Sequence, residues 1–482
     1  MAPAHISTLP PELLNQIVAD IDPKDSASLA ALARTSRRFQ ALVTPTLYHT
    51  VAFDMDKTEE RRPDSSPLLA FVERMLAAPD RLAPLVRDFW INGTPEMGDL
   101  RPVLGMVCRQ VMRYSRRSPH ETSIEALEMV SMVATWEGVV TGARSGSWDT
   151  GEYVGLLATL LLPRLSSLRC ARFGGVGSPP GLALLMEIID QAQDPVLAAA
   201  GIRHGMPFWQ ELEEVELNGG FDEHPPSPDA IAFFAQWPSV KRIYSAGYIN
   251  RDAGDQLETA FRSLKPSSLS LESLVLGPHT QLSHPHLDEL LGAPRALRVF
   301  RYNFANRRTE TKFRTAILQR SLERQKHALE ELSLVHGYYK WRHANGQVYD
   351  EEHNLYGDIL GPMSFAAFAK LRVLEISLPF VFGQAVVCFT HGTPPRRNSD
   401  VANPSPEQQR SCETRLLEML PRSIETVRFA QCGDRWAARL LGSALVPLVD
   451  EVRAGAGGGF RCCGQWRCIF IAVVSTRRFP TG

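Results

Sequence analysis

The 482-residue sequence lacks an excess of charge of either sign, since 52 Lys and Arg residues stand against 53 Asp and Glu residues. No global field would draw such a chain to nucleic acid or to an anionic membrane. Two basic clusters that contain aromatic residues, 113–118 and 304–314, fit solvated helix faces better than a nucleic-acid site. No stretch reaches the roughly 18 apolar residues of a membrane-spanning helix, and the amino terminus has no basic segment followed by a long apolar run. We therefore expect a soluble protein of the cytoplasm and/or nucleus, with no nucleic-acid or membrane partner.

Cysteine is also sparse, with eight residues scattered along the chain. This density is too low for a disulfide scaffold and fits free thiols in a reducing compartment. Cys462, Cys463 and Cys468 lie close together, but a tetrahedral zinc site needs two spaced pairs of ligands, and no second CxxC or HxxxH pair accompanies them. We therefore predict no metal site there.

Short catalytic motifs are missing as well, since the sequence contains no GxSxG elbow, no GxxxxGKS or GxxxxGKT loop, no GxGxxG turn and no HExxH pair. Three neighbouring histidines could ligate zinc, but their Pro-rich setting favours a solvated loop that leads into a helix capped near Ser283. Three carboxylates flank or alternate with the apolar residues of an expected strand, so they face solvent or a recognition surface. We expect neither an enzyme nor a cofactor. The histidines are His279, His284 and His286, and the carboxylates belong to Glu213, Glu214 and Glu216.

The densest apolar pattern stands in residues 5–51 and predicts three short helices. Pro10 and Pro11 fix the backbone where a helix begins, and Glu12 places an acid in its first turn. Three short helices in about 40 residues bury too little apolar surface to be stable alone, so we expect a partner for part of their apolar face. The apolar stripe of the first helix comprises Leu13, Leu14, Ile17 and Val18.

The second and third helices have candidate caps. Asp25 or Ser26 precedes the second helix, and Ser36 precedes the third, which Pro45 is predicted to interrupt. The expected buried residues are Leu29, Leu32 and Ala33 in the second helix and Phe39, Leu42 and Val43 in the third.

The segment "LPPELLNQIVADIDPKDSASLAALARTSRRFQALVTPTLYHTV" resembles an F-box, and its sequence is most similar to F-box proteins of filamentous fungi. The shared features are Leu-Pro-x-Glu-Leu at the first helix, a D-P-x-D turn, an S-R-R-F third helix and a Leu-Tyr close. The resemblance implies a Skp-type adaptor as partner and, through it, a cullin. The alternative is a private three-helix cap on the domain that follows. The residues implied as adaptor contacts or their support are Leu9, Pro10, Glu12, Leu13, Ile17, Leu29, Leu32 and Ala33.

Beyond a charged linker, 52–67, an apolar pattern with the spacing L-x-x-L-x-L recurs along residues 68–454. This is the core spacing of a leucine-rich repeat, in which a short strand alternates inward side chains. Chance occurrence of so loose a pattern is the alternative, but many copies follow a helix-like run. The copies are Val86-Phe89-Ile91, Ile124-Leu127-Met129, Leu165-Leu168-Cys170, Leu212-Val215-Leu217, Leu271-Leu274-Leu276, Leu297-Phe300-Tyr302, Leu329-Leu332-Leu334, Leu371-Leu374-Ile376, Ile424-Val427-Phe429 and the weaker Val240-Ile243.

The spacing between copies is irregular, which indicates degenerate repeats with inserted loops. We predict an α/β fold, with an N-terminal three-helix F-box at 5–51 followed by a leucine-rich-repeat-like α/β solenoid. The polar, Pro-rich segment 390–412 is an expected disordered loop, and the Gly- and Cys-rich tail 455–482 is atypical and expected to be unstructured.

These features predict a substrate-recognition adaptor subunit of a Skp–cullin–F-box ubiquitin ligase, in which the repeats hold an unknown target protein for ubiquitination. The alternative is a repeat scaffold that binds proteins without a ligase. The sequence does not name the target, because repeat proteins choose partners by surface residues. Aromatic residues of the strand face, such as Tyr244, Tyr302 and Tyr338, are candidate contacts, although a buried or solvated role is the commoner one for any single tyrosine.

Overall fold

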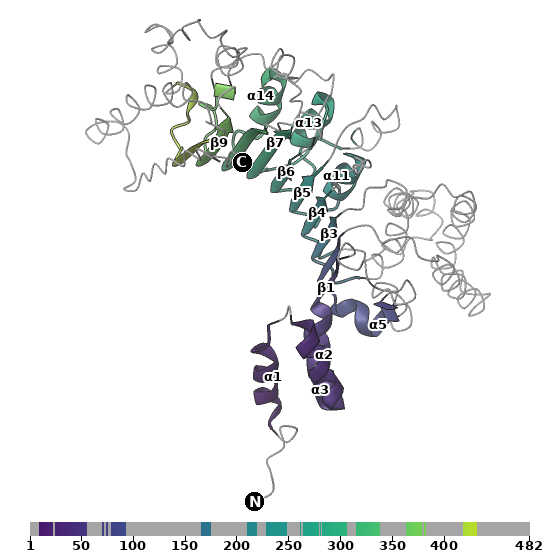
Figure 1. The fold of residues 1–482 in the computed structure, drawn as a ribbon. Coiled ribbons are helices and arrows are strands. Elements are labelled where there is room, and N and C mark those ends of the chain that lie inside the picture. The colour runs from purple at the N-terminus through teal and green to yellow at the C-terminus, as the bar shows by residue number, and fades with distance from the viewer. Residues whose placement is uncertain are drawn as a thin grey trace, which may run out of the picture. The chain divides into compact units, whose positions relative to one another are not determined.

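The computed structural model divides into two compact units, one formed by Met1–Ala230 and Pro238–Val240 and the other by Ile231–Trp237 and Lys241–Gly482. Each unit contains parallel β-strands, and the first also contains the N-terminal helices (Figure 1). The residues that the structure describes are 9–22, 25–54, 70–71, 74–75, 79–92, 165–174, 210–218, 228–247, 261, 264–278, 280, 282–305, 315–337, 363–377, 380–381 and 418–430.

Three helices open the first unit, as the sequence predicts: α1 (Pro11–Ala19), α2 (Ser26–Thr35) and α3 (Arg37–His49). The carboxylate of Asp25 accepts a hydrogen bond from the backbone N–H of Ser28 at 3.0 Å, so Asp25 rather than Ser26 caps α2. The hydroxyl of Ser36 accepts one from the N–H of Phe39 at 3.2 Å and caps α3. Each cap satisfies a backbone donor that the first helical turn leaves without a partner.

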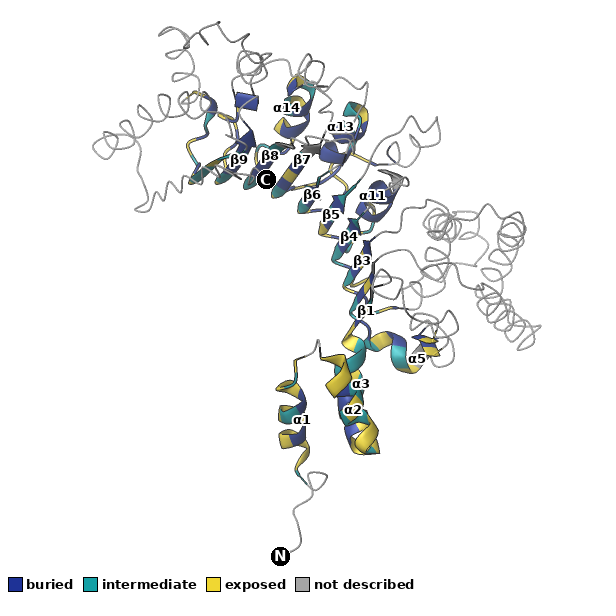
Figure 2. Ribbon diagram, viewed as in Figure 1, coloured by how far each residue is buried: buried dark blue, intermediate teal, exposed yellow. Residues whose placement is uncertain are grey.

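A small apolar core joins the three helices, with one buried residue from each: Val18, Leu29 and Val43. Burying an aliphatic side chain of this size contributes about 1.5–3 kcal/mol, so three of them give the bundle only a modest interior. Much of the rest of the helix surface is exposed (Figure 2). Partly buried residues packed around this core are Ile21, Leu32, Ala33, Leu42 and Leu47.

Pro45 does not interrupt the third helix, and this prediction was wrong. Helix α3 runs through Pro45 to His49. A proline inside a helix removes one backbone hydrogen bond and crowds the preceding turn. The residues that follow still gain from staying helical, because Leu47 packs against the core of the bundle.

Strand β1 (Thr50–Asp54) begins directly after α3 and pairs in parallel with β2 (Asp88–Asn92). The first three residues of the predicted linker 52–67 therefore lie in a strand, and 55–67 fall outside the described residues. The last helix of the N-terminal bundle and the first strand of the sheet are thus one continuous stretch of chain.

The sheet of the first unit follows chain order, β1 to β4, with parallel neighbours. Short helices α5 (Pro79–Leu82) and η3 (Ala83–Leu85) lead into β2. Inward positions alternate with outward ones along each strand, as the period of two requires. The remaining strands are β3 (Cys170–Gly174) and β4 (Glu214–Asn218).

The second unit continues the same plan, with parallel neighbours from β5 to β10. Helices α13 (His284–Gly292) and α14 (Thr315–Glu323) lie side by side against this sheet (Figure 1), and α11 (Pro228–Ala235) lies where the chain passes between units. The strands are β5 (Arg242–Ala246), β6 (Ser273–Leu276), β7 (Val299–Ala305), β8 (Glu331–Gly337), β9 (Val373–Ser377) and β10 (Thr426–Ala430).

Among the described strands, the recurring apolar pattern marks β2 and β4–β10 correctly, misses β1 and is shifted in register at β3. In β3 the residues paired with Val215 and Leu217 are Ala171 and Phe173, so Cys170 points outward and the predicted copy Leu165-Leu168-Cys170 was placed three residues early. Leu165 and Leu168 are both buried, which explains the error. The predicted copy at 124–129 lies outside the described residues.

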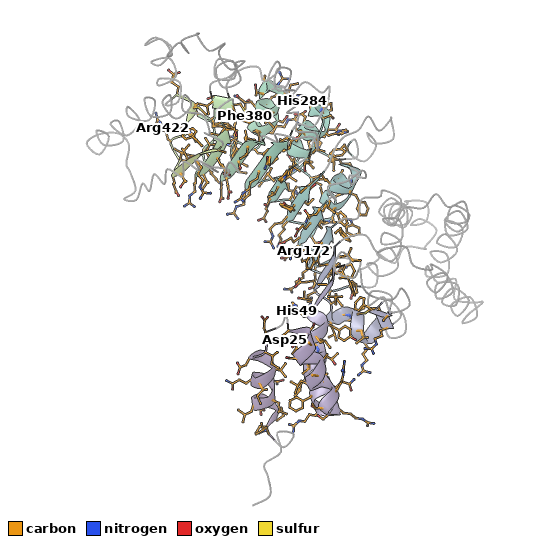
Figure 3. All side chains as sticks on the ribbon, in the orientation of Figure 1. Asp25, His49, Arg172, His284, Phe380 and Arg422 are labelled. Atoms are coloured by element: carbon orange, nitrogen blue, oxygen red, sulfur yellow. The ribbon has the colours of Figure 1, made fainter. Side chains whose placement is uncertain are left out.

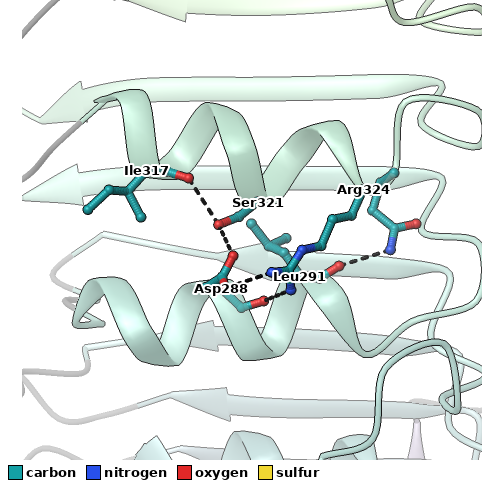
Figure 4. Close-up of polar contacts among 6 residues, drawn as sticks. Asp288, Leu291, Ile317, Ser321 and Arg324 are labelled. Atoms are coloured by element: carbon teal, nitrogen blue, oxygen red, sulfur yellow. Dashed lines mark hydrogen bonds and ion pairs between the residues drawn. The ribbon is translucent and has the colours of Figure 1, made fainter.

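Helices α13 and α14 are joined by polar contacts (Figure 4). The Ser321 hydroxyl donates to Asp288 Oδ1 at 2.6 Å, and Arg324 Nη2 donates to Asp288 Oδ2 at 2.9 Å. Just beyond α14, the buried Gln325 side chain donates to the carbonyls of Leu291 and Pro294 at 2.9 and 3.0 Å. These contacts fix the spacing of one helix–strand unit against the next.

Opposite charges precede successive strands of the second unit. Arg298 makes two hydrogen bonds of 3.0 Å with Glu330, and Arg372 makes two of 2.7 and 2.9 Å with Glu425. These arginines lower the pKa of both glutamates, chiefly through the hydrogen bonds that they donate. The pairs are exposed, so each adds little stability. Because Arg and Glu alternate from one strand to the next, the native order of the strands brings opposite charges together, and this favours it over other orders.

Candidate functional site

Helix α1 presents the first part of the candidate site. Pro10 occupies the N-cap position with φ −55°, its carbonyl accepts a hydrogen bond from Leu14 N–H at 3.2 Å, and Pro11 stands at the first helical position. Proline suits the first helical position, because a backbone N–H at that position would have no acceptor within the helix and its absence therefore costs nothing. Glu12 lies exposed in the first turn, where the helix dipole favours a negative charge.

The apolar stripe of α1 divides between two faces. Leu14 and Val18 are buried against the other helices, with 0% and 4% of their surface exposed. Leu13 is 47% exposed, and Ile17 is half-buried. In the part of the chain that the structure describes, Leu13 and Trp90 are the large apolar side chains classed as exposed.

Helix α2 contributes the other predicted contacts, which the structure separates into interior and surface. Leu29 is completely buried, so it supports the site and does not present a surface of its own. Leu32 and Ala33 are half-buried and pack on the core formed by Val18, Leu29 and Val43. Leu9 is half-buried before α1, so seven of the eight predicted residues keep some accessible surface.

Charge is unevenly distributed over the three helices. Acidic residues surround the end of α1 and the start of α2, and a short basic run joins α2 to α3. Hydrogen bonds from the Ser28 side chain and backbone lower the pKa of the exposed Asp25 carboxyl. A partner of these helices would meet exposed acidic and basic side chains as well as the apolar Leu13. The exposed acids are Glu12, Asp20, Asp22 and Asp25, and the exposed bases are Arg34, Arg37 and Arg38.

An aromatic cluster that the sequence did not predict connects the third helix to the sheet. The rings of Tyr48 and Phe71 lie 6.4 Å apart, and Phe53 lies 5.5 Å from Phe71 and 6.3 Å from Phe89. Arg74 donates to the Tyr48 hydroxyl at 3.4 Å. Phe53 and Phe89 stand at the inward positions of adjacent strands, a signal that strand periodicity could have given, but Phe71 carries no such signal.

The three tyrosines proposed as strand-face contacts have different positions. Tyr302 is 2% exposed and points inward, where its hydroxyl accepts a hydrogen bond from Leu282 N–H at 3.3 Å, so it is not a surface contact. Burial raises the pKa of Tyr302 far above its ordinary value. Tyr244 is half-buried on the outward face of β5, and Tyr338 lies outside the described residues.

The predicted solvated histidine loop is partly wrong. His286 is 8% exposed, its ring lies 4.5 Å from that of Phe261, and burial lowers its pKa. Its Nδ1 lies 2.7 Å from the hydroxyl of Ser283, the residue that precedes α13 as predicted. His284 is half-buried in the first turn, and His279 lies outside the described residues.

The acidic residues of β4 face outward, as the alternation predicts. Arg172 of β3 lies 3.6 Å from Glu214 and 3.2 Å from Glu216, so these carboxylates form ion pairs across the strands. Cys170, the free cysteine of the described residues, is half-buried beside them, and burial raises the pKa of its thiol to about 11.

Other predicted features receive no further support from the structure. Among the described residues, no group of three His, Cys, Asp or Glu side chains is arranged to hold a metal ion. In the same part of the chain, every helix is too short or too polar to cross a lipid bilayer. The predicted loop 390–412, the tail 455–482 and the basic cluster 113–118 lie outside the described residues.

Comparison with protein families identifies the N-terminal part of the chain. A search of curated proteins finds no match to the chain. The family model described as F-box-like matches residues 6–54, which span α1, α2, α3 and β1. The three-helix bundle with its exposed Leu13 is therefore an F-box-like domain.

Proposed function

We propose that this protein is a substrate-recognition adaptor subunit of a Skp–cullin–F-box ubiquitin ligase, of the type found in filamentous fungi. F-box domains generally bind Skp-type adaptors. The F-box-like domain at 6–54 carries the proposal, together with the exposed Leu13 on its first helix. The adaptor brings a cullin, and the chain itself supplies no catalytic residue. It works in the cytoplasm and/or nucleus.

In this proposal the adaptor covers the outer edge of α1 and the adjoining part of α2. Leu13 would move from 47% exposed to buried, and removing an apolar side chain from water contributes about 25 cal/mol per Å² of covered surface. Glu12 and Pro10 would fix the approach beside it. The direct contacts are Leu9, Pro10, Glu12, Leu13, Ile17, Leu32 and Ala33, and Leu29 supports them from the interior.

The parallel-strand sheet would hold the target, as a set of degenerate leucine-rich repeats. The support is the parallel order of short strands, most of which bury apolar residues at alternate positions, as β2, β4, β6 and β9 do. Ubiquitin transfer then depends on proximity, because holding the target near the activated ubiquitin raises its effective concentration.

A fixed connection between the two functions follows from the way α3 joins β1. The helix ends at His49 and the strand begins at Thr50, and the ring cluster of Tyr48, Phe53 and Phe71 packs around this junction. The adaptor and strands β1–β4 would therefore keep a constant geometry. The position of a target lysine relative to the adaptor would therefore vary little.

Co-purification of the full chain with a Skp-type adaptor and a cullin tests the proposal. We expect Leu13→Asp and Ile17→Asp to abolish adaptor capture, because a carboxylate cannot enter an apolar contact without a large desolvation cost. Asn15→Asp is the matched control, since it adds the same charge to an exposed position about 200° further around α1.

Circular dichroism should show that all three variants keep their helices. Adaptor capture by Leu13→Asp at the wild-type level would refute the contact surface. Capture of the adaptor without any cullin would instead favour the alternative, a repeat scaffold that binds proteins outside a ligase. Failure of the wild-type chain to capture either protein would refute the proposal altogether.

A further inference from the structure

The turns that precede β6, β7, β8, β9 and β10 in the second unit each contain an exposed or half-buried cation. Arg422, labelled in Figure 3, belongs to the last of these turns. In the part of the chain that the structure describes, the side chains of these cations make no hydrogen bond or ion pair. The cations are Lys265, Arg295, Lys326, Lys370 and Arg422, and the turns that contain them are called the basic turns below.

Hydrogen bonds join consecutive basic turns, so the cations follow one edge of the sheet. Neighbouring strands lie about 4.8 Å apart, and the basic turns therefore span about 19 Å. An extended polypeptide advances about 3.3 Å per residue, so about six residues reach from the first turn to the last. The joining contacts are Arg295 N–H to the Leu269 carbonyl at 3.1 Å, Gln325 Nε2 to the Pro294 carbonyl at 3.0 Å, Ala369 N–H to the Lys326 carbonyl at 3.1 Å and Ser423 Oγ to the Leu371 carbonyl at 2.9 Å.

Positive charge exceeds negative charge along this edge. Glu330 and Glu425 already have partners, because Arg298 and Arg372 donate to them. Lys370 also lies near Glu330 and helps to lower its pKa, after the larger effect of Arg298. When every Lys, Arg, Asp and Glu of the described residues 264–272, 294–298, 325–330, 363–372 and 418–425 is counted, seven cations stand against four carboxylates. The cations are those of the basic turns with Arg298 and Arg372, and the carboxylates belong to Glu272, Glu330, Glu418 and Glu425.

We propose that the basic turns bind an extended acidic segment of the target protein, about six residues long with about three Asp or Glu side chains. The excess of three positive charges sets the number of carboxylates, and the span of the turns sets the length of the segment. Each carboxylate would meet the lysine or arginine of the turn that it reaches. Such pairs stay partly hydrated, so they select the partner and speed association more than they add affinity.

This inference rests on the proposed function, because it names the class of target that the sheet would hold. An acidic polypeptide fits this edge better than nucleic acid, since the interspersed carboxylates would repel a continuous row of phosphates. Single-stranded nucleic acid also binds by stacking its bases on exposed rings. The phenylalanines described in the basic turns, Phe365 and Phe368, are completely buried and offer no such ring.

Fluorescence anisotropy with two labelled peptides tests the inference on the full-length protein. Both are ten-residue Gly-Ser peptides that carry the same uncharged dye, one with the centre Glu-Ser-Glu-Ser-Glu and the other with Lys-Ser-Lys-Ser-Lys. We expect the glutamate peptide to bind about tenfold more tightly or better, because several exposed ion pairs act together. Its binding should weaken as sodium chloride is raised from about 50 to about 300 mM, because salt screens exposed charges.

The double variant Arg295→Gln, Lys326→Gln should weaken glutamate-peptide binding about fivefold, since each exposed pair contributes little alone. The matched control is Arg320→Gln, Arg428→Gln, which removes the same charge from exposed positions of α14 and β10 outside the basic turns and should leave binding unchanged. Equal binding of both peptides, or an equal loss in both double variants, would overturn the inference. Tighter binding of a ten-nucleotide oligothymidine than of the glutamate peptide would also overturn it. The comparison of the two peptides uses the wild-type chain, so it decides the question even if a variant unfolds.

The outcomes also separate this inference from the proposed function. Adaptor and cullin capture with no preference for the glutamate peptide would overturn the inference alone. Glutamate-peptide binding that depends on Arg295 and Lys326, without adaptor capture, would overturn the ligase proposal and leave a protein that binds acidic segments.

Discussion

Gln325 is the polar side chain whose removal should cost the second unit most. It is 4% exposed and lies beyond the end of α14. Its Nε2 donates to the carbonyls of Leu291 and Pro294, and its Oε1 accepts from Leu297 N–H at 3.0 Å. One amide therefore serves three backbone groups at and beyond the end of α13, before β7 begins.

Gln325→Leu keeps nearly the same volume and removes all three hydrogen bonds. A buried polar group left without its partner costs about 1–3 kcal/mol, and partial rehydration makes three such costs less than additive. We expect a loss of about 3 kcal/mol, which is a large part of the roughly 5–15 kcal/mol that stabilises a typical domain.

Denaturant unfolding and amide hydrogen exchange measure the effect at two levels. The unfolding midpoint should fall with little change of slope, because the same surface is exposed on unfolding. Exchange at the Leu297 amide should become about a hundredfold faster, since about 1.4 kcal/mol corresponds to a factor of ten. The control is Gln319→Leu, which removes bonds to the exposed Ser364 N–H and Glu323 and should cost about 0.5 kcal/mol.

The reasoning fails if Gln325→Leu is no more destabilising than Gln319→Leu. It also fails if the unfolding midpoint falls while exchange at Leu297 stays as slow as in the wild type. The second outcome would mean that the amide is protected by other contacts and that the loss arises elsewhere.

Three further predictions concern single groups. Ser36→Ala should destabilise the helical bundle by about 1 kcal/mol, measured by thermal unfolding, because the N–H of Phe39 loses its cap; Ser36→Asp should restore it. Folding lowers the pKa values of Glu330 and Glu425, so the stability that they contribute is fully present above their ordinary pKa of 4.5 and is lost as the pH falls through the lowered values. The denaturant concentration at the unfolding midpoint should therefore decrease once the pH is below about 4.5, and this decrease should be smaller in high salt. Cys170, with a thiol pKa of about 11, should react with iodoacetamide at pH 8 about a hundredfold more slowly than an ordinary thiol, which peptide mass spectrometry would show; equal rates would contradict its burial.

Local signals predicted the N-terminal bundle well, because caps and helix starts depend on residues close in sequence. Asp25 and Ser36 cap α2 and α3 through bonds to residues three positions later. The failure at Pro45 has a tertiary cause, since contacts of Leu47 with the bundle core offset the local cost of the proline. Local propensity is a weak guide wherever packing of this kind competes with it.

Strand positions were predictable where leucine or another large apolar residue fills the inward sites. Strand β3 was misplaced because Ala171 takes such a site, while the buried Leu165 and Leu168 lie in the preceding turn. The role of Gln325 was not predictable, since its three partners lie about 30 residues earlier in the chain. Contacts of that separation leave no periodic trace in a single sequence.

For the exposed apolar residues, too, the sequence predicts the apolar pattern but not which residues the fold buries. Periodicity groups Leu13 with Leu14 in one apolar stripe, and only the packing of α2 and α3 shows that Leu14 is interior and Leu13 is exposed. Trp90 belongs to an apolar run with Phe89 and Ile91, yet strand alternation turns it alone to the outside. In both places an apolar residue keeps a surface that the fold itself does not cover. The sequence shows that the segment contains more apolar residues than its local core can bury. The structure then identifies which of these residues remains exposed.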